Sequence, residues 1–303
     1  MSDPATRPEP VADEGPAASP SPTAVFRRRD FRYLWLAQLV STSGSALTDL
    51  AAGIYVFRET QSALAVGLTL IVTAIPSLVI GLLAGVFVDR HDRRRIMIWT
   101  LLVQAALVGL IPVAIGIEGL GLIGLYVLLL LSAGVRQFFD PAYDSIIPEV
   151  ASDDELTAAN AYLSIASFGS TALGFAAAGL LASTVDIAWA FVIDAVTFIV
   201  AAWCIARVAP RPMPVPEDDA SVGVIVANLR AGIGTLAGMP ILRSLFLLGA
   251  LMFFSYGLWN VLLLPMAISV LGASGVEDGG QEAVTAVGFV LGSLTRARGS
   301  VRR

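Results

Sequence analysis

The sequence predicts an all-α integral membrane protein, and three observations support that fold class. Hydrophobic residues make up 56% of the 303 positions and charged residues only 14%, which is more apolar than a soluble domain of this length can bury in one core. Apolar runs recur at close to the ~20 residues that a helix needs to cross ~30 Å of hydrocarbon. The basic residues are clusters of arginine beside those runs, and the chain contains no lysine. Most of the chain is therefore expected to lie in membrane lipid.

The chain opens with a segment unlike the rest. Residues 1–25 are rich in Pro, Ala, Ser, Asp and Glu, and without periodic apolar residues they are predicted to be a disordered N-terminal tail. An arginine cluster then precedes a first span that runs to about Val56. This span is longer than the core of a signal peptide and lacks an obvious cleavage site. Six further spans are predicted at 63–88, 96–117, 120–138, 158–183, 187–208 and 241–268.

The stretch between the sixth and seventh spans divides the chain. It is first Pro-rich and acidic, and then holds a segment, Val222–Leu236, that could form a surface-lying helix. The last part holds the seventh span and a short eighth run, Ala283–Thr295, which ends at arginines as if the chain were truncated or frameshifted there. The predicted parts are a tail at 1–25, a six-helix bundle at 26–208, a cytoplasmic linker at 209–240 and a partial second bundle at 241–303.

The placement of arginine predicts the orientation. With the N-terminus inside, the loop arginines fall on the cytoplasmic side apart from Arg58, as the positive-inside rule requires. We therefore expect a multi-pass protein of the inner (plasma) membrane with a cytoplasmic N-terminus and membrane lipid as its partner.

The first span carries a polar stripe. Gln38, Thr42, Ser45 and Asp49 recur at steps of four, three and four residues, which places them on one helical face. Polar side chains inside a span are expensive against hydrocarbon, so this face is expected to line a cavity or an ion path. Asp49 is the leading candidate for proton coupling. The alternative is a structural carboxylate that is hydrogen-bonded to neighbouring helices.

The other polar or reactive residues in or near the spans include one further cavity candidate, Asn260, and several with structural roles. Asp194 lies among apolar neighbours in the outer half of the sixth span, and we predict a structural carboxylate there in preference to a proton site. Asn260 and Trp259 could reach a central cavity, although Trp259 could equally belong to the outer aromatic belt. Cys204 is predicted to pack in a helix, and His91 to be solvated among arginines.

The loop between the second and third spans carries the most specific motif, which reads GVFVDRHDRRR. It resembles the signature loop of the major facilitator superfamily, with Asp92 where that family usually has glycine. The resemblance implies that the loop aspartate holds a cytoplasmic gate by binding near the start of a helix in the second half of the transporter. The alternative is an arginine patch that stops transfer, which explains the charges but not the glycine four residues before an Asp-Arg pair. The motif residues are Gly85, Asp89, Arg90, Arg93 and Arg94.

A second resemblance surrounds the end of the fourth span. From Arg136 the chain reads RQFFDPA, and it continues with IPE at 147–149 and with Leu156, Ala158 and Asn160. This pattern is similar to the macrolide-efflux and siderophore-export branch of the superfamily. The resemblance implies a major-facilitator-type helical bundle, of which this chain would hold one six-helix half plus the first two helices of the second half. Arg136 is then either a headgroup anchor or part of a charge relay with the loop aspartate.

Together these features predict a secondary active transporter that exports small molecules of the drug, antibiotic or siderophore type by proton antiport. We expect the chain to have no ATPase of its own, because the absence of lysine excludes a Walker A loop. The alternatives are a truncated membrane fragment that does not transport, or a membrane partner or permease of another transport system.

Composition also disfavours other classes. One cysteine and one histidine leave no material for a disulfide or a zinc cluster, so no metal or cofactor is expected. The net charge of -5 argues against nucleic acid as a partner. An intramembrane enzyme is disfavoured because the histidine lies in a loop and no Ser/His set can be assembled in the spans.

Overall fold

The computed structural model describes residues 22–184, 186–209 and 222–269. Within these residues every regular element is a helix, which confirms the predicted all-α class. The elements are η1 (Pro22–Arg27), α1 (Arg29–Thr60), α2 (Ala63–Val79), α3 (Gly81–Asp89), α4 (Arg93–Ile115), α5 (Gly121–Val150), η2 (Asp153–Glu155), α6 (Leu156–Thr184), α7 (Ala188–Ala206), α8 (Val222–Gly238) and α9 (Pro240–Ser269).

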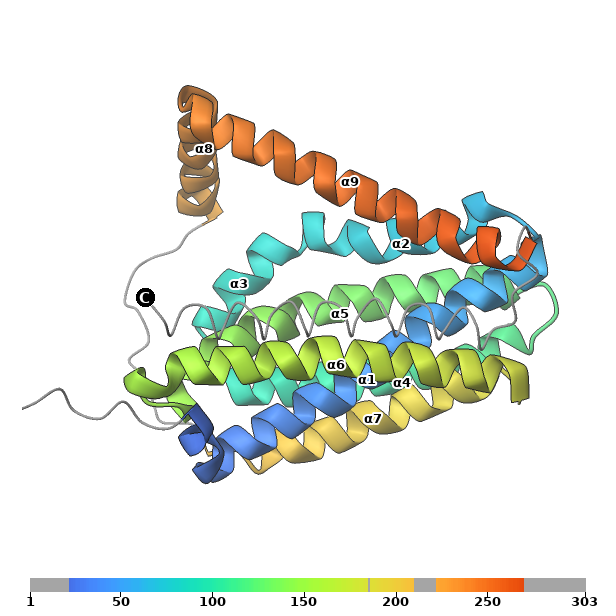
Figure 1. The fold of residues 1–303 in the computed structure, drawn as a ribbon, viewed down its shortest axis with the longest axis horizontal. Helices are drawn as coiled ribbons and strands as arrows, with labels where there is room; N and C mark the ends of the chain where they lie inside the picture. Colours follow the sequence, from blue (N-terminus) through green and yellow to red (C-terminus); the bar gives the residue numbers. More distant parts are fainter. Residues whose placement is uncertain (1–21, 185, 210–221, 270–303) are drawn as a thin grey trace, which may run out of the picture.

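The helices α1, α4, α5, α6 and α7 form an elongated bundle (Figure 1). The helix α1 packs on α6 and α7, and α4 packs on α5 and α7. Helices α2 and α3 lie on the α5 side of this bundle, α9 runs past α2, and α8 stands apart from the bundle. One continuous apolar cluster extends through the bundle and includes Phe31, Met97, Leu125 and Phe191, all less than 2% exposed.

Among the residues that the structure describes, five helices are long and apolar enough to cross a membrane, namely α4, α5, α6, α7 and α9, and the bent pair α2 and α3 can serve as a sixth span. The prediction of seven spans is therefore met only in part. Although α1 is long enough, it is less apolar than the others, because it carries the polar stripe. Its apolar residues face the bundle instead, and Leu34, Leu47 and Ile54 are almost fully buried.

The predicted span at 63–88 is two helices, with a bend of 54° between α2 and the end of α3. Pro76 and Gly81 flank the break, and both residue types disfavour a continuous helix. The predicted fourth span was also wrong in length. It was expected to end at 138, but α5 continues through Pro141 and Pro148 to Val150. Buried residues at helical spacing sustain this extension, and they are Phe139, Ala142, Tyr143, Ile146, Ile147 and Val150.

The end of the predicted tail is ordered. Residues 22–25, assigned to the disordered segment, belong to η1, and Val25 is fully buried. The burial of Val25 and the ring contacts of Phe26 with Trp35 and Tyr162 explain why these residues are held. The predicted surface segment is helical as α8, which extends to Gly238. The remainder of the tail, the first half of the linker and the predicted eighth run at Ala283–Thr295 lie outside the described residues.

Candidate functional site

A polar cavity of about 270 Å³ lies inside the bundle. It is lined by side chains of α1, α2, α4, α5 and α7. Ser45 and Asp49 come from the middle of α1, and Arg136 comes from the middle of α5. The cavity therefore sits at about half the height of the bundle, where a group in a membrane-spanning protein is farthest from bulk water on either side.

A smaller pocket of about 30 Å³ adjoins this cavity, and its walls share Ser45, Gln104, Arg136 and Phe198 with it. Gln38 and Thr42 line this second pocket. The structure therefore places all four residues of the polar stripe on the walls of two neighbouring pockets. Further polar side chains face these pockets from other helices, where no local sequence pattern indicates a site, and they are Thr73, Gln104, Ser132 and Gln137.

Asp49 has no hydrogen-bond or ion-pair partner among the described residues, and its side chain is exposed to the cavity. Most carboxylates inside proteins accept hydrogen bonds or pair with a cation, because an isolated charge away from bulk water is costly. The structural alternative required hydrogen bonds from neighbouring helices, and within the described part of the chain Asp49 receives none. Hydrogen bonds from the described helices therefore do not account for this carboxylate.

Asp194, in contrast to Asp49, is buried and has hydrogen-bond partners. Its side chain is 1% exposed, and its Oδ2 accepts a hydrogen bond from the Thr48 hydroxyl at 2.6 Å. The Thr197 hydroxyl lies 3.0 Å from its Oδ1. Gly44 makes room for this arrangement, since a Cβ there would overlap with both Asp194 Oδ1 and Thr197 Oγ1.

These bonds agree with a structural carboxylate, but Asp194 also lines the main cavity. The prediction of a structural carboxylate rested on the apolar neighbours of Asp194 along its own helix. A further signal in the sequence is Thr197, three residues later on the same helical face. The partner on α1, Thr48, could not be found without the packing of α1 on α7.

Arg136 was predicted to lie at the end of the fourth span, and this prediction is wrong. The helix α5 continues well beyond Arg136. Its guanidinium lines both pockets and pairs with Asp140 one turn later at 3.6 Å. Among the described residues no ion pair involves Asp89. Neither the headgroup anchor nor the relay with Asp89 is therefore seen, and Arg136 instead supplies a positive charge to the cavity that contains Asp49.

The motif loop joins α3 to α4. Gly85 lies within α3 and Asp89 ends it, while Asp89 and Arg90 are both exposed. Asp92 takes an extended conformation and caps α4, where its side chain accepts a hydrogen bond from the Arg95 backbone N–H at 3.0 Å. This backbone has no positive φ, which explains why aspartate is accommodated where the resembling loops have glycine. The His91 ring is exposed and stacks on Phe87.

Two arginines of the motif, in the first turn of α4, bind the neighbouring helices at one end of the bundle. Arg93 pairs with Glu149 and donates to the Ser145 carbonyl oxygen at 3.3 Å, both near the C-terminus of α5. Arg94 donates to the carbonyl oxygens of Ile205 and Ala206 at the C-terminus of α7. A cation at a helix C-terminus is stabilised by the helix dipole and satisfies carbonyl groups that lack helical partners. The loop therefore ties α4 to both neighbouring helices.

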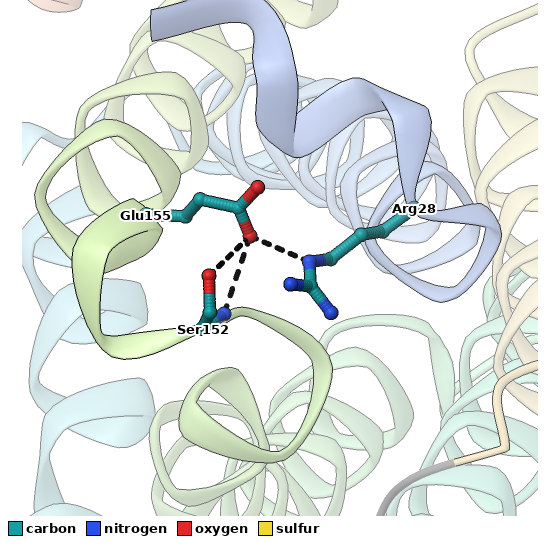
Figure 2. Close-up of polar contacts among 3 residues, drawn as sticks. All are labelled: Arg28, Ser152 and Glu155. Atoms are coloured by element: carbon teal, nitrogen blue, oxygen red, sulfur yellow. Dashed lines mark hydrogen bonds and ion pairs between the residues drawn. The ribbon is translucent and has the colours of Figure 1, made fainter. Parts of the chain in front are cut away.

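A second polar contact ties α1 to α6 at the same end (Figure 2). The Arg28 guanidinium donates to Glu155 Oε2 at 2.5 Å, and the Ser152 hydroxyl donates to the same oxygen at 2.7 Å. The Ser152 backbone N–H also donates to it at 3.3 Å, so that the Glu155 carboxylate satisfies a backbone donor at the start of η2. The hydrogen bonds from Ser152 and Arg28 lower the pKa of Glu155 below its ordinary value.

The remaining predicted residues do not join the cavity. Trp259 lies on α9 with half of its surface exposed. Asn260 also belongs to α9, but its side chain is outside the described part of the structure. Cys204 is fully buried in the core. Within the described ranges, no group of three His, Cys, Asp or Glu side chains is placed to hold a metal ion.

Comparison with known proteins gives a consistent set of matches. The pattern of a family described as "Transmembrane secretion effector" matches residues 20–300. Macrolide efflux protein A of Streptococcus pyogenes is 26% identical over 266 residues, which cover 87% of this chain and 65% of that protein. Multidrug efflux pump Tap of Mycolicibacterium fortuitum is 26% identical over 226 residues, covering 72% of this chain and 55% of Tap.

The putative bacilysin exporter BacE of Bacillus subtilis (strain 168) is 32% identical over 138 residues, which cover 45% of this chain and 33% of that protein. This chain thus spans less than two-thirds of the length of these curated relatives.

Proposed function

Because the chain belongs to the transmembrane secretion effector family of the major facilitator superfamily, we propose that it is part of a secondary active transporter that exports small molecules in exchange for protons. Its relatives are named as macrolide, multidrug and bacilysin exporters, and drug-like or antibiotic-like molecules are the substrate class that we propose here. The chain would supply a six-helix half at residues 26–208 and the beginning of a second half after the linker.

The observation that carries this proposal is Asp49 in the central cavity. A carboxylate with no described protein partner, at mid-height in a membrane-spanning bundle, is costly unless it binds a proton or a cation during function. Ser45 and Gln104 give the same cavity neutral hydrogen-bonding groups that could orient a substrate. A polar site of this kind, near the midplane and between helices, is where secondary transporters bind their substrates.

In the proposed cycle, a proton from outside binds Asp49 and is released inside, while the two halves rock about the cavity and release substrate outside. Arg136 shares the cavity with Asp49, so it stabilises the ionised carboxylate after the proton has left. Binding of a proton removes this attraction. The change in charge would then favour the opposite opening of the cavity.

The motif loop would act at the cytoplasmic end. Arg93 and Arg94 are engaged within this half, whereas Asp89 is exposed and unpaired within the described part of the chain. We infer that Asp89 is free to bind a helix N-terminus of the second half when the cytoplasmic side is closed. The N-terminus of the chain would then be cytoplasmic, and the protein would lie in the plasma (inner) membrane.

The test is efflux of a fluorescent dye or antibiotic from cells that express the transporter. Collapse of the proton gradient should stop efflux by the wild type, and depletion of ATP at a maintained gradient should not. Asp49→Asn should abolish gradient-driven efflux, and Asp154→Asn, which changes an exposed carboxylate in η2, should leave it intact. Efflux that follows ATP instead would indicate a permease driven by a separate ATPase. Normal efflux by Asp49→Asn would remove the basis of the proposed coupling.

A further inference from the structure

The carboxyl group of Asp194 is enclosed between α1 and α7 and forms part of the wall of the main cavity. Its two oxygens have different neighbours. Oδ2 accepts from the Thr48 hydroxyl at 2.6 Å, and Oδ1 lies 3.0 Å from the Thr197 hydroxyl. Gly44 lies against the same group, and a Cβ at this position would overlap with Oδ1.

The Thr197 hydroxyl has a choice of acceptor. Besides Asp194 Oδ1, it lies 2.7 Å from the backbone carbonyl oxygen of Asp194. A hydroxyl carries one proton and two acceptor lone pairs, so it can donate to only one of these two oxygens at a time. Both are close enough for a hydrogen bond.

Two hydrogen-bond arrangements therefore fit the same heavy-atom positions. In the first, Asp194 is ionised and Thr197 donates to Oδ1. In the second, Oδ1 carries a proton and donates to Thr197 Oγ1, while Thr197 donates to the backbone carbonyl. Thr48 donates to Oδ2 in both. Neither form of the carboxyl leaves a donor or acceptor unsatisfied, which is the usual penalty for changing the charge of a buried group.

Few other charges face this site. Asp49 of α1 and Arg136 of α5 line the same cavity, and α4 contributes the uncharged Gln104 to it. Asp49 and Arg136 are therefore the described charges that an added proton on Asp194 would affect. Asp194 differs from Asp49 in having a built set of hydroxyl partners for either protonation state.

We propose that Asp194 is a second proton-binding residue of the cavity, which holds its proton on Oδ1 against the Thr197 hydroxyl. This proposal rests on the proposed function, because it supplies a place for a proton that has entered the cavity. Asp49 would exchange protons with the cavity water, and Asp194 would change protonation state without rearrangement of α1 and α7.

The experiment is infrared spectroscopy of the purified chain in detergent, titrated with pH. A protonated carboxylic acid has a carbonyl band apart from those of carboxylates and amides. We expect a component of this band to disappear as the pH rises and to be absent in Asp194→Asn. Thr197→Val should move it to higher frequency, because the acid loses the oxygen to which it donates, and Thr197→Ser, which keeps the hydroxyl, should not.

Persistence of every component in Asp194→Asn would overturn the proposal, as would an unshifted band in Thr197→Val. The pair of Thr197 variants decides the matter even where Asp194→Asn does not fold. The spectrum is also separable from transport, since loss of gradient dependence in efflux with the Asp194 component intact would refute the proposed antiport and leave this proton site standing.

Discussion

Gly44→Ala tests the contact between α1 and α7 that holds Asp194 in the cavity wall. Gly44 is buried in α1, and an added Cβ would overlap with Asp194 Oδ1 and Thr197 Oγ1 and lie 3.0 Å from Thr197 Cβ. The structure can accommodate the added methyl group in two ways. Either α1 moves away from α7, or the carboxyl of Asp194 leaves its position and loses the bond from Thr48.

Three effects determine how much Gly44→Ala lowers the free energy of unfolding. Overpacking of a core by one carbon costs about 1–3 kcal/mol. Loss of a hydrogen bond to a charged group costs about 1.5–3 kcal/mol more, and alanine recovers ~1 kcal/mol relative to glycine within a helix. We therefore expect Gly44→Ala to lower the free energy of unfolding by about 1.5–5 kcal/mol.

Denaturant unfolding in detergent micelles, followed by circular dichroism, measures this loss. The matched control is Gly169→Ala in α6, because a Cβ at Gly169 meets no atom within 4 Å. This control should be neutral or stabilising by up to ~1 kcal/mol. Equal effects of the two substitutions would refute the close packing of α1 on Asp194.

Three further predictions concern the packing and charges of the bundle. Gly174→Ala places a Cβ against the Ser43 carbonyl oxygen and 2.7 Å from Ala46 Cβ, so thermal unfolding should reveal a loss of about 1–3 kcal/mol; an unchanged midpoint would contradict it. Arg93→Ala leaves the buried Glu149 carboxylate unpaired, at about 3–5 kcal/mol in denaturant unfolding, and adding Glu149→Gln should recover part of the loss; no recovery would point to another cause. The lowered pKa of Glu155 makes its contribution to stability complete above its ordinary pKa of 4.5 and lost as the pH falls through the lower folded value. The acid-side fall of the melting temperature should therefore be steeper in the wild type than in Glu155→Gln, and equal slopes would contradict this.

The polar stripe was predictable because it depends on one helix only. The steps between Gln38, Thr42, Ser45 and Asp49 define a face from helical geometry, and a polar face in a membrane span needs protein or water beside it. Asp194 could not be assigned to the cavity from the sequence, because its place there depends on the packing of two helices. Its partner Thr48 is 146 residues away along the chain, and no local pattern predicts that α1 and α7 pack together there.

The errors in element length have a similar cause. The fourth span was expected to end at 138, yet α5 continues through Pro141 and Pro148 because its buried face and the pairing of Glu149 with Arg93 outweigh the lost backbone hydrogen bonds. Tertiary packing also orders Val25, which composition alone assigned to a disordered tail. Propensity was outweighed in both places by contacts with helices distant in sequence.

Proton exchange at Asp49 requires that water reach the polar stripe of α1 inside the bundle. We would replace Cys204 with alanine, introduce Ser45→Cys, and measure its reaction with a small charged thiol reagent in membranes. The control is Leu102→Cys on α4, where the side chain is exposed on the bundle but lines neither pocket. Thiols react as thiolates and need water, so position 45 should react many times faster than position 102. An inert cysteine at position 45 under every condition, with position 102 equally inert, would mean that the cavity is dry and that Asp49 cannot exchange protons through it.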